Sequence, residues 1–136
     1  MKTQNRRDFI LTTALLGTSL TAAAFAPASN KKNKLQVIHH VFFWLKNPAS
    51  KDDLDKLLEG TRQLKKIETV RQIHMGVPAA VAPRPVVDGS YSLSLLLFFD
   101  DLAGQNTYQV HPIHQEFIKN HSPLWEKFIV YDAAGV

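Results

Sequence analysis

The hydrophobic pattern after residue 36 constrains the fold of this chain most, because it switches between the period of a strand and that of a helix. Residues 37–45 are almost all apolar or aromatic, and only His39 and His40 interrupt them. Such a run predicts a strand that is buried on both faces. Ser50 and Asp53 then have the spacing of a capping box, and apolar residues recur at helical spacing over four further turns. This segment predicts a helix.

The same alternation of periods continues towards the C-terminus. A weaker strand is predicted over residues 70–77, followed by a proline-rich loop and a strand over 91–99 that is substantially apolar on both faces. Asp100 or Asp101 can cap a second helix. Pro112 must interrupt or restart this helix, because proline lacks the amide hydrogen and clashes with the preceding turn.

A final strand, predicted over residues 127–132, completes the order strand, helix, strand, strand, helix, strand. This is the split arrangement of a ferredoxin-like α+β fold. Two helices cover only one face of a four-stranded sheet, yet the first and third strands are apolar on both faces. The second face must therefore be buried by a ligand or by something beyond this chain. We expect a homodimer that packs sheet against sheet.

The first 28 residues have the composition of a signal peptide. Arg6 and Arg7 precede the large apolar residue Phe9, and the apolar stretch ends in alanines. This stretch is too short and too rich in Thr, Gly and Ser for a membrane span. Its start resembles the twin-arginine pattern, whose pathway exports folded cargo. A Sec signal or an uncleaved anchor is the alternative. We expect export to the periplasm, with membrane contact only through this leader.

The predicted organisation is a signal peptide, a basic polar linker and one domain: residues 1–28, 29–36 and 37–132.

Charge and composition exclude several classes of function. Three of the 16 basic and one of the 12 acidic residues lie in the leader, so the net charge of +4 falls to +2 in the remainder. Without a long basic stripe and interleaved aromatic residues, nucleic-acid binding is not expected. The chain has no cysteine, which excludes disulfides, thiolate metal sites and a cysteine nucleophile. It also lacks a glycine-rich phosphate loop and a Gly-x-Ser-x-Gly motif. No cofactor is expected.

Several segments together resemble the Dabb family, the stress-responsive dimeric α/β barrel proteins. The matching segments are residues 39–46, 87–91, 108–117, Trp125 and 130–132. The most specific of them is the Tyr-x-x-His-Pro-x-His-x-x-Phe stretch at 108–117. The resemblance extends over about residues 37–132, and it implies a two-chain barrel with a cavity under the helices. It implies less about chemistry, because one fold hosts unrelated activities.

The resemblance also implies site residues. A plant polyketide cyclase of this family closes a ring by an aldol-type step, and its catalytic histidine and tyrosine match His114 and Tyr108. A histidine of its first strand matches His39. We expect His39, His111 and Tyr91 to be binding residues. The chain lacks a further pocket histidine of the third strand and a tyrosine of the first helix, so the resemblance implies a different substrate pocket.

Elementary chemistry singles out the same histidine independently. If Pro112 opens a new helix, His111 becomes its cap and His114 lies in the first turn, where the helix dipole disfavours the charged imidazolium. A neutral imidazole can act as a base. Alternatively, His114 is a buried structural residue, or it binds a metal ion together with His111 and His121, because three histidines are a common ligand set for zinc. The break at Pro112 argues against that common face, and we expect no metal.

Two classes of function remain open. The favoured one is an exported stress-responsive module that binds a small apolar or aromatic ligand between the helices and the sheet. The alternative is a cofactor-free enzyme in which His114 removes a proton from carbon next to a carbonyl while Tyr108 hydrogen-bonds the developing enolate. An exported protein would not meet the activated intermediates that a plant-type polyketide cyclase uses, so export favours the first class.

Overall fold

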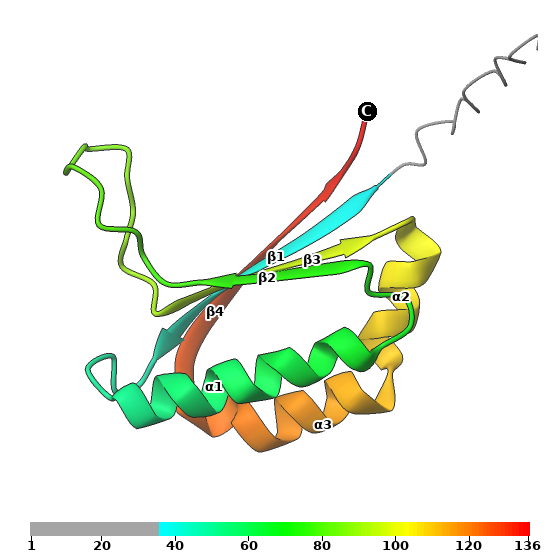
Figure 1. Ribbon diagram of the computed structural model, residues 1–136, viewed down its shortest axis with the longest axis horizontal. Helices are drawn as coiled ribbons and strands as arrows, with labels where there is room; N and C mark the ends of the chain where they lie inside the picture. Colours follow the sequence, from blue (N-terminus) through cyan, green and yellow to red (C-terminus); the bar gives the residue numbers. More distant parts are fainter. Residues whose placement is uncertain (1–35) are drawn as a thin grey trace, which may run out of the picture. The chain divides into compact units, whose positions relative to one another are not determined.

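A computed structural model describes residues 36–136, and these fold into a sheet layered on helices. The strands lie on one side, and helices α1 and α3 run beneath them (Figure 1). The strands are β1 (Val37–Leu45), β2 (Gln72–Gly76), β3 (Leu93–Phe99) and β4 (Trp125–Ala134). The helices are α1 (Lys51–Gln63), α2 (Leu102–Val110) and α3 (Pro112–His121), with short 3₁₀ turns at Leu64–Lys66 and Ser122–Leu124. The predicted signal peptide and residues 29–35 of the predicted linker lie outside the described residues.

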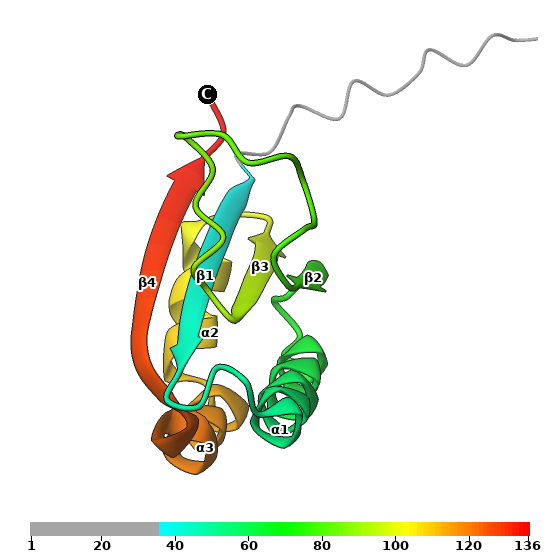
Figure 2. The ribbon, with the colours of Figure 1, turned by 90° about the vertical axis from the view of Figure 1, so that its left-hand side faces the viewer.

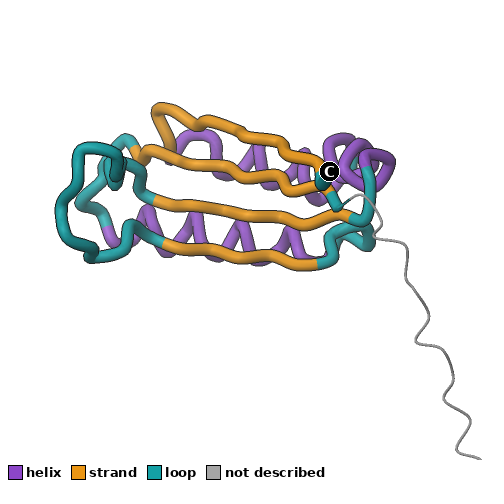
Figure 3. The backbone as a smooth tube through the Cα atoms, turned by 90° about the horizontal axis from the view of Figure 1, so that it is seen from above, coloured by secondary structure: helices purple, strands orange, loops and turns teal. Residues whose placement is uncertain are grey.

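The four strands form one antiparallel sheet in the order β2-β3-β1-β4. Figure 2 shows β4 at one edge of this sheet and β2 at the other. Seen from above in Figure 3, the strands lie over the helices. The prediction of a ferredoxin-like α+β fold is confirmed. In the register of the sheet, His39 of β1 lies between Leu97 of β3 and Asp132 of β4, which places a histidine beside a carboxylate.

The first helix begins as predicted. The Ser50 hydroxyl accepts a hydrogen bond from the backbone amide of Asp53 at 3.1 Å, which satisfies one of the free amides of the first turn. The α-helix ends at Gln63, and the 3₁₀ turn that follows covers the rest of the predicted helical spacing. None of the helices within residues 36–136 is long and apolar enough to cross a membrane.

Three strand boundaries differ from the prediction. β2 is shorter than residues 70–77, and β4 is longer than 127–132 because it pairs along the whole of β1, with a bulge near Trp44. β3 begins at Leu93 instead of Tyr91. The hydroxyl of Ser92 accepts a hydrogen bond from the Leu45 amide, so the alternation of faces does not extend back to Tyr91. That ring lies instead against Phe42, with 4.9 Å between the ring centroids.

Pro112 divides the second helical segment in two. α2 ends at Val110, and α3 starts with Pro112 as its first residue. His111 between them is extended (φ −65°, ψ 136°), and its Nδ1 accepts a hydrogen bond from the Ile113 amide at 3.1 Å. Both the restart at Pro112 and the capping by His111 are therefore confirmed, and the chain changes direction within one residue.

The two faces of the sheet differ in burial. The face towards the helices holds the core, whose fully buried members include Leu57, Leu64, Leu93, Leu95, Leu97 and Phe99. We call the opposite side the outer face. There Ile38, His40, Phe42 and Trp44 of β1 alternate with the core residues and are half-buried, as are Leu96 and Phe98 of β3. The long loop between β2 and β3 rises on this side of the sheet (Figure 1). Within one chain the outer face thus remains apolar and only partly covered.

Candidate functional site

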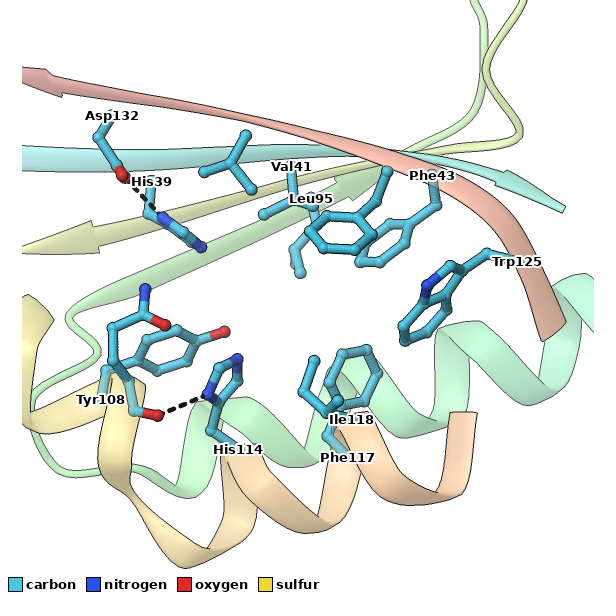
Figure 4. Close-up of a pocket in the computed structure, with 13 residues that line it drawn as sticks. His39, Val41, Phe43, Leu95, Tyr108, His114, Phe117, Ile118, Trp125 and Asp132 are labelled. Carbon is cyan, nitrogen blue, oxygen red and sulfur yellow. Dashed lines mark hydrogen bonds and ion pairs between the residues drawn. The ribbon is translucent and has the colours of Figure 1, made fainter. Parts of the chain in front are cut away.

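A cavity of about 320 Å³ lies between the sheet and α2–α3. Most of its lining is apolar, with an aromatic end formed by Phe43, Phe117, Trp125 and Phe128. The polar side chains of the lining are those of His39, Tyr108, Gln109, His114 and Asp132. In Figure 4, His39 and Asp132 extend from the sheet, and Tyr108 and His114 approach them from the helices. The cavity therefore has a polar end and an aromatic end.

The break at Pro112 brings Tyr108 and His114 together. The two residues lie in different helices, and their ring centroids are 4.3 Å apart. His114 Nδ1 lies 3.1 Å from the backbone oxygen of Gln109. A carbonyl oxygen only accepts hydrogen bonds, so Nδ1 carries the hydrogen and Nε2 of the neutral ring holds a free lone pair. The site thus contains an imidazole nitrogen that can accept a proton.

Burial adjusts the protonation of both residues. The pKa of His114 is lowered from its ordinary 6.5, first by loss of solvent around the ring and further by the neighbouring His39 and His111, although its hydrogen bond to Gln109 acts in the opposite direction. Burial raises the pKa of Tyr108, whose side chain is 1% exposed. His114 is therefore a neutral base near pH 7, and Tyr108 keeps its proton and can donate a hydrogen bond.

His39 and Asp132 form a second polar pair across neighbouring strands. His39 Nδ1 donates to Asp132 Oδ1 at 2.6 Å. The His39 side chain is 6% exposed and the Asp132 side chain 51% exposed, so the carboxylate joins the cavity to solvent. The Tyr108 ring also approaches this pair, with 5.7 Å between its centroid and that of His39. A carboxylate in this position orients the imidazole ring.

The structure therefore brings three of the predicted site residues together: His114, Tyr108 and His39. Two others lie outside the cavity lining. His111 is occupied as the cap of α3, and its Nε2 lies 3.4 Å from Glu68 Oε2. Tyr91 packs against Phe42 on the outer face. Sequence reasoning gave no role to Asp132 or Gln109. Asp132 lies beside His39 because β1 pairs with β4, so a prediction of this pairing and its register would have identified Asp132.

The three histidines considered for metal binding have separate environments. The ring nitrogens of His111, His114 and His121 contact the Ile113 amide, the Gln109 carbonyl and the Phe117 carbonyl. Within residues 36–136, no group of three or more His, Asp or Glu side chains is arranged to hold a metal ion.

Comparisons with known proteins identify the family through its family model and the fold through solved structures. The family model of the Stress responsive A/B Barrel Domain (Dabb) matches residues 37–134. A Dabb family protein with a ferredoxin-like fold from Mesorhizobium loti is 24% identical, with a TM-score of 0.63 over 75% of this chain and 98% of that one. A hydroxynitrile lyase from Passiflora edulis is 22% identical, with a TM-score of 0.65 over 76% and 95% of the two chains. A dimeric ferredoxin-like protein of unknown function from Thermobifida fusca is 17% identical, with a TM-score of 0.60 over 74% and 92%. A search of curated proteins found no match.

Proposed function

The chain belongs to the stress-responsive A/B barrel family, Dabb, and from this premise we propose that it is an exported, homodimeric binding protein for a small apolar or aromatic ligand. The observation that carries the proposal is the cavity between the sheet and α2–α3. Its volume of about 320 Å³ lies at the lower end of the usual range for ligand sites, about 300–1,000 Å³. The ligand is therefore compact.

The two ends of the cavity describe the ligand further. The aromatic end favours an alkyl group or an aromatic ring, since large rings provide much contact area. At the polar end, the Tyr108 hydroxyl donates and the His114 Nε2 accepts. A hydroxyl oxygen on an apolar body can satisfy both groups. A ketone oxygen accepts from Tyr108 only, while the polarised C–H next to the carbonyl can face Nε2, and we take aryl and alkyl ketones as the ligand class to test.

The outer face of the sheet supports the homodimer. It is apolar and only half-buried within one chain, which is typical of a surface that a partner covers. Three solved structures with this fold are described as dimeric, from Thermobifida fusca, Bacteroides fragilis and Jannaschia. For export, the support is the paired arginines and the apolar stretch of the leader.

A cavity-filling pair of variants tests ligand binding. Ile118 lines the cavity from α3, so Ile118→Trp should abolish the binding of acetophenone measured by calorimetry. Val110 lies outside the lining and is 75% exposed, so Val110→Trp places the same indole away from the cavity and should bind as the wild type does. Native mass spectrometry of protein from its own periplasm would show the natural ligand. Wild-type protein that binds no ketone and carries no small molecule would contradict the proposal.

A second candidate function is acid–base catalysis, and the free Nε2 of His114 beside the Tyr108 hydroxyl favours it. In this step Nε2 accepts a proton from carbon next to a carbonyl, and the electron pair of the broken C–H bond forms the C=C bond of an enolate. The oxygen gains the negative charge and takes a hydrogen bond from Tyr108. The hydroxynitrile lyase from Passiflora edulis is an example of an enzyme built on this fold.

Hydrogen exchange separates catalysis from binding alone. In heavy water, a catalytic site would replace the hydrogens next to the carbonyl of phenylacetone by deuterium, which proton NMR records as loss of those signals. We expect the wild type to accelerate this exchange and His114→Ala to lose the effect. Tight binding of phenylacetone without any acceleration would contradict the catalytic candidate and leave the binding function in place.

A further inference from the structure

A second hollow of about 300 Å³ lies behind the ligand cavity, between α1 and α3. We call it the helix groove. Its lining combines the polar residues Gln63, Lys66, Glu116 and Asn120 with the apolar residues Ile113 and Phe117. Phe117 is the one residue that the linings of the cavity and of the helix groove share. Phe117 therefore lies in the wall that is common to two spaces of similar size.

The Phe117 ring is held from both sides. It is 4% exposed, and on the cavity side its centroid lies 5.8 Å from that of Trp125 and 6.4 Å from that of Phe43. Figure 4 shows it at the helix side of the cavity, across from these rings. On the groove side, the His121 ring stacks on it with 5.1 Å between centroids and 23° between planes. These contacts on both sides hold the Phe117 ring in place.

The position of His121 depends in turn on a glycine of α1. A Cβ atom at Gly60 would overlap the His121 ring. His121 Nδ1 also donates to the Phe117 carbonyl at 3.0 Å. The missing side chain at position 60 thus lets the imidazole lie between the two helices, where it supports the Phe117 ring.

From this arrangement we propose that Phe117 determines ligand length: it closes the cavity against the helix groove, so that the apolar part of a ligand ends at its ring. The inference rests on the proposed ligand-binding function and adds a specificity residue to it. Without the phenyl ring the cavity and the helix groove would join into one slot. A chain that is too long for the cavity would then extend between α1 and α3.

A homologous series of ketones tests this role. Acetophenone, butyrophenone, hexanophenone and octanophenone share one polar group and differ only in chain length, and calorimetry gives the dissociation constant of each. For the wild type we expect affinity to rise with chain length and then to fall once the chain meets Phe117. For Phe117→Ala we expect affinity to rise through octanophenone, by about fourfold per added methylene that becomes buried. Acetophenone should bind both proteins within a few fold.

Two further variants make the test decisive. Phe117→Leu keeps an apolar side chain and leaves a smaller void than alanine does. It therefore replaces Phe117→Ala if circular dichroism shows that the alanine variant does not fold. Ile113→Ala widens only the helix groove and should keep the chain-length limit of the wild type. If both Phe117 variants keep the chain-length limit of the wild type, the proposed role of Phe117 is overturned and the binding function stands. If no ketone binds the folded wild type or any variant, the proposed function fails, and this inference fails with it.

Discussion

Replacing His114 by alanine should cost little stability and yet weaken ligand binding. The ring makes one hydrogen bond, to the Gln109 carbonyl, and that oxygen also accepts from Gln115 Nε2 at 2.7 Å. No buried acceptor is therefore left unpaired, and the loss is about 1 kcal/mol. The contact with Tyr108 adds about 0.5–1.5 kcal/mol. Alanine is the better helix former by roughly 0.5 kcal/mol, which offsets part of the cost.

The expected net destabilisation of His114→Ala is thus about 1–2 kcal/mol. The void that alanine leaves opens into the existing cavity, so no sealed hole forms in the core. Urea denaturation gives the free energy of unfolding, and calorimetry with acetophenone gives binding. His121→Ala is a matched control, because its Nδ1 also donates to a backbone carbonyl, that of Phe117, but its ring lies outside the cavity lining. It should show a similar stability change and bind acetophenone within a few fold of wild type. A loss above roughly 3 kcal/mol for His114→Ala, the range of large-to-small core substitutions, would show that His114 is a structural core residue and would refute the site.

Three other expectations are open to direct measurement. Because burial lowers the pKa of His114 from 6.5, the unfolded chain binds more protons just below that pH. The free energy of unfolding should therefore fall as the pH drops below about 6.5. In His114→Ala this free energy should depend less steeply on pH, and the remaining dependence should come from His40, whose pKa burial also lowers. Leu96→Asp on the outer face should produce monomers in sedimentation, whereas a wild type that sediments as a folded monomer at micromolar concentration would contradict the dimer. Lysine at both Arg6 and Arg7 should abolish export without affecting folding, and normal periplasmic levels of this double variant would indicate a Sec signal.

The fold was predictable because local rules and sequence periodicity agree along this chain. Ser50 caps α1, and Pro112 restarts the helix, since capping and the missing amide of proline act over a few residues. Strand ends were less accurate because they depend on the partner strand. β4 reaches Ala134 because β1 begins opposite it at Val37, and no property of residues 133–134 alone indicates this pairing.

The candidate site was predictable only in part, for the same reason. His114 and Tyr108 were identified because they lie in one short motif and because the dipole argument is local. Asp132 was missed, since its approach to His39 comes from pairing of strands that are far apart in the sequence. Tyr91, which was expected to be a binding residue, lies on the outer face against Phe42, because the regular alternation of β3 begins only at Leu93.

The single residue between α2 and α3 makes the polar pair Tyr108–His114 independent of the strand residues that line the rest of the cavity. Evolution or a protein engineer can therefore change one without the other. Tyr108 and His114 face each other because the chain bends between them, so a contiguous stretch of chain carries this pair with its geometry. Val41, Phe43, Leu95 and Val130 of the strands line the remaining walls. Substitutions there alter which molecules fit and leave the bend intact. Under the proposed binding function, substitutions in the strands would change the ligand while the polar pair is inherited as a unit.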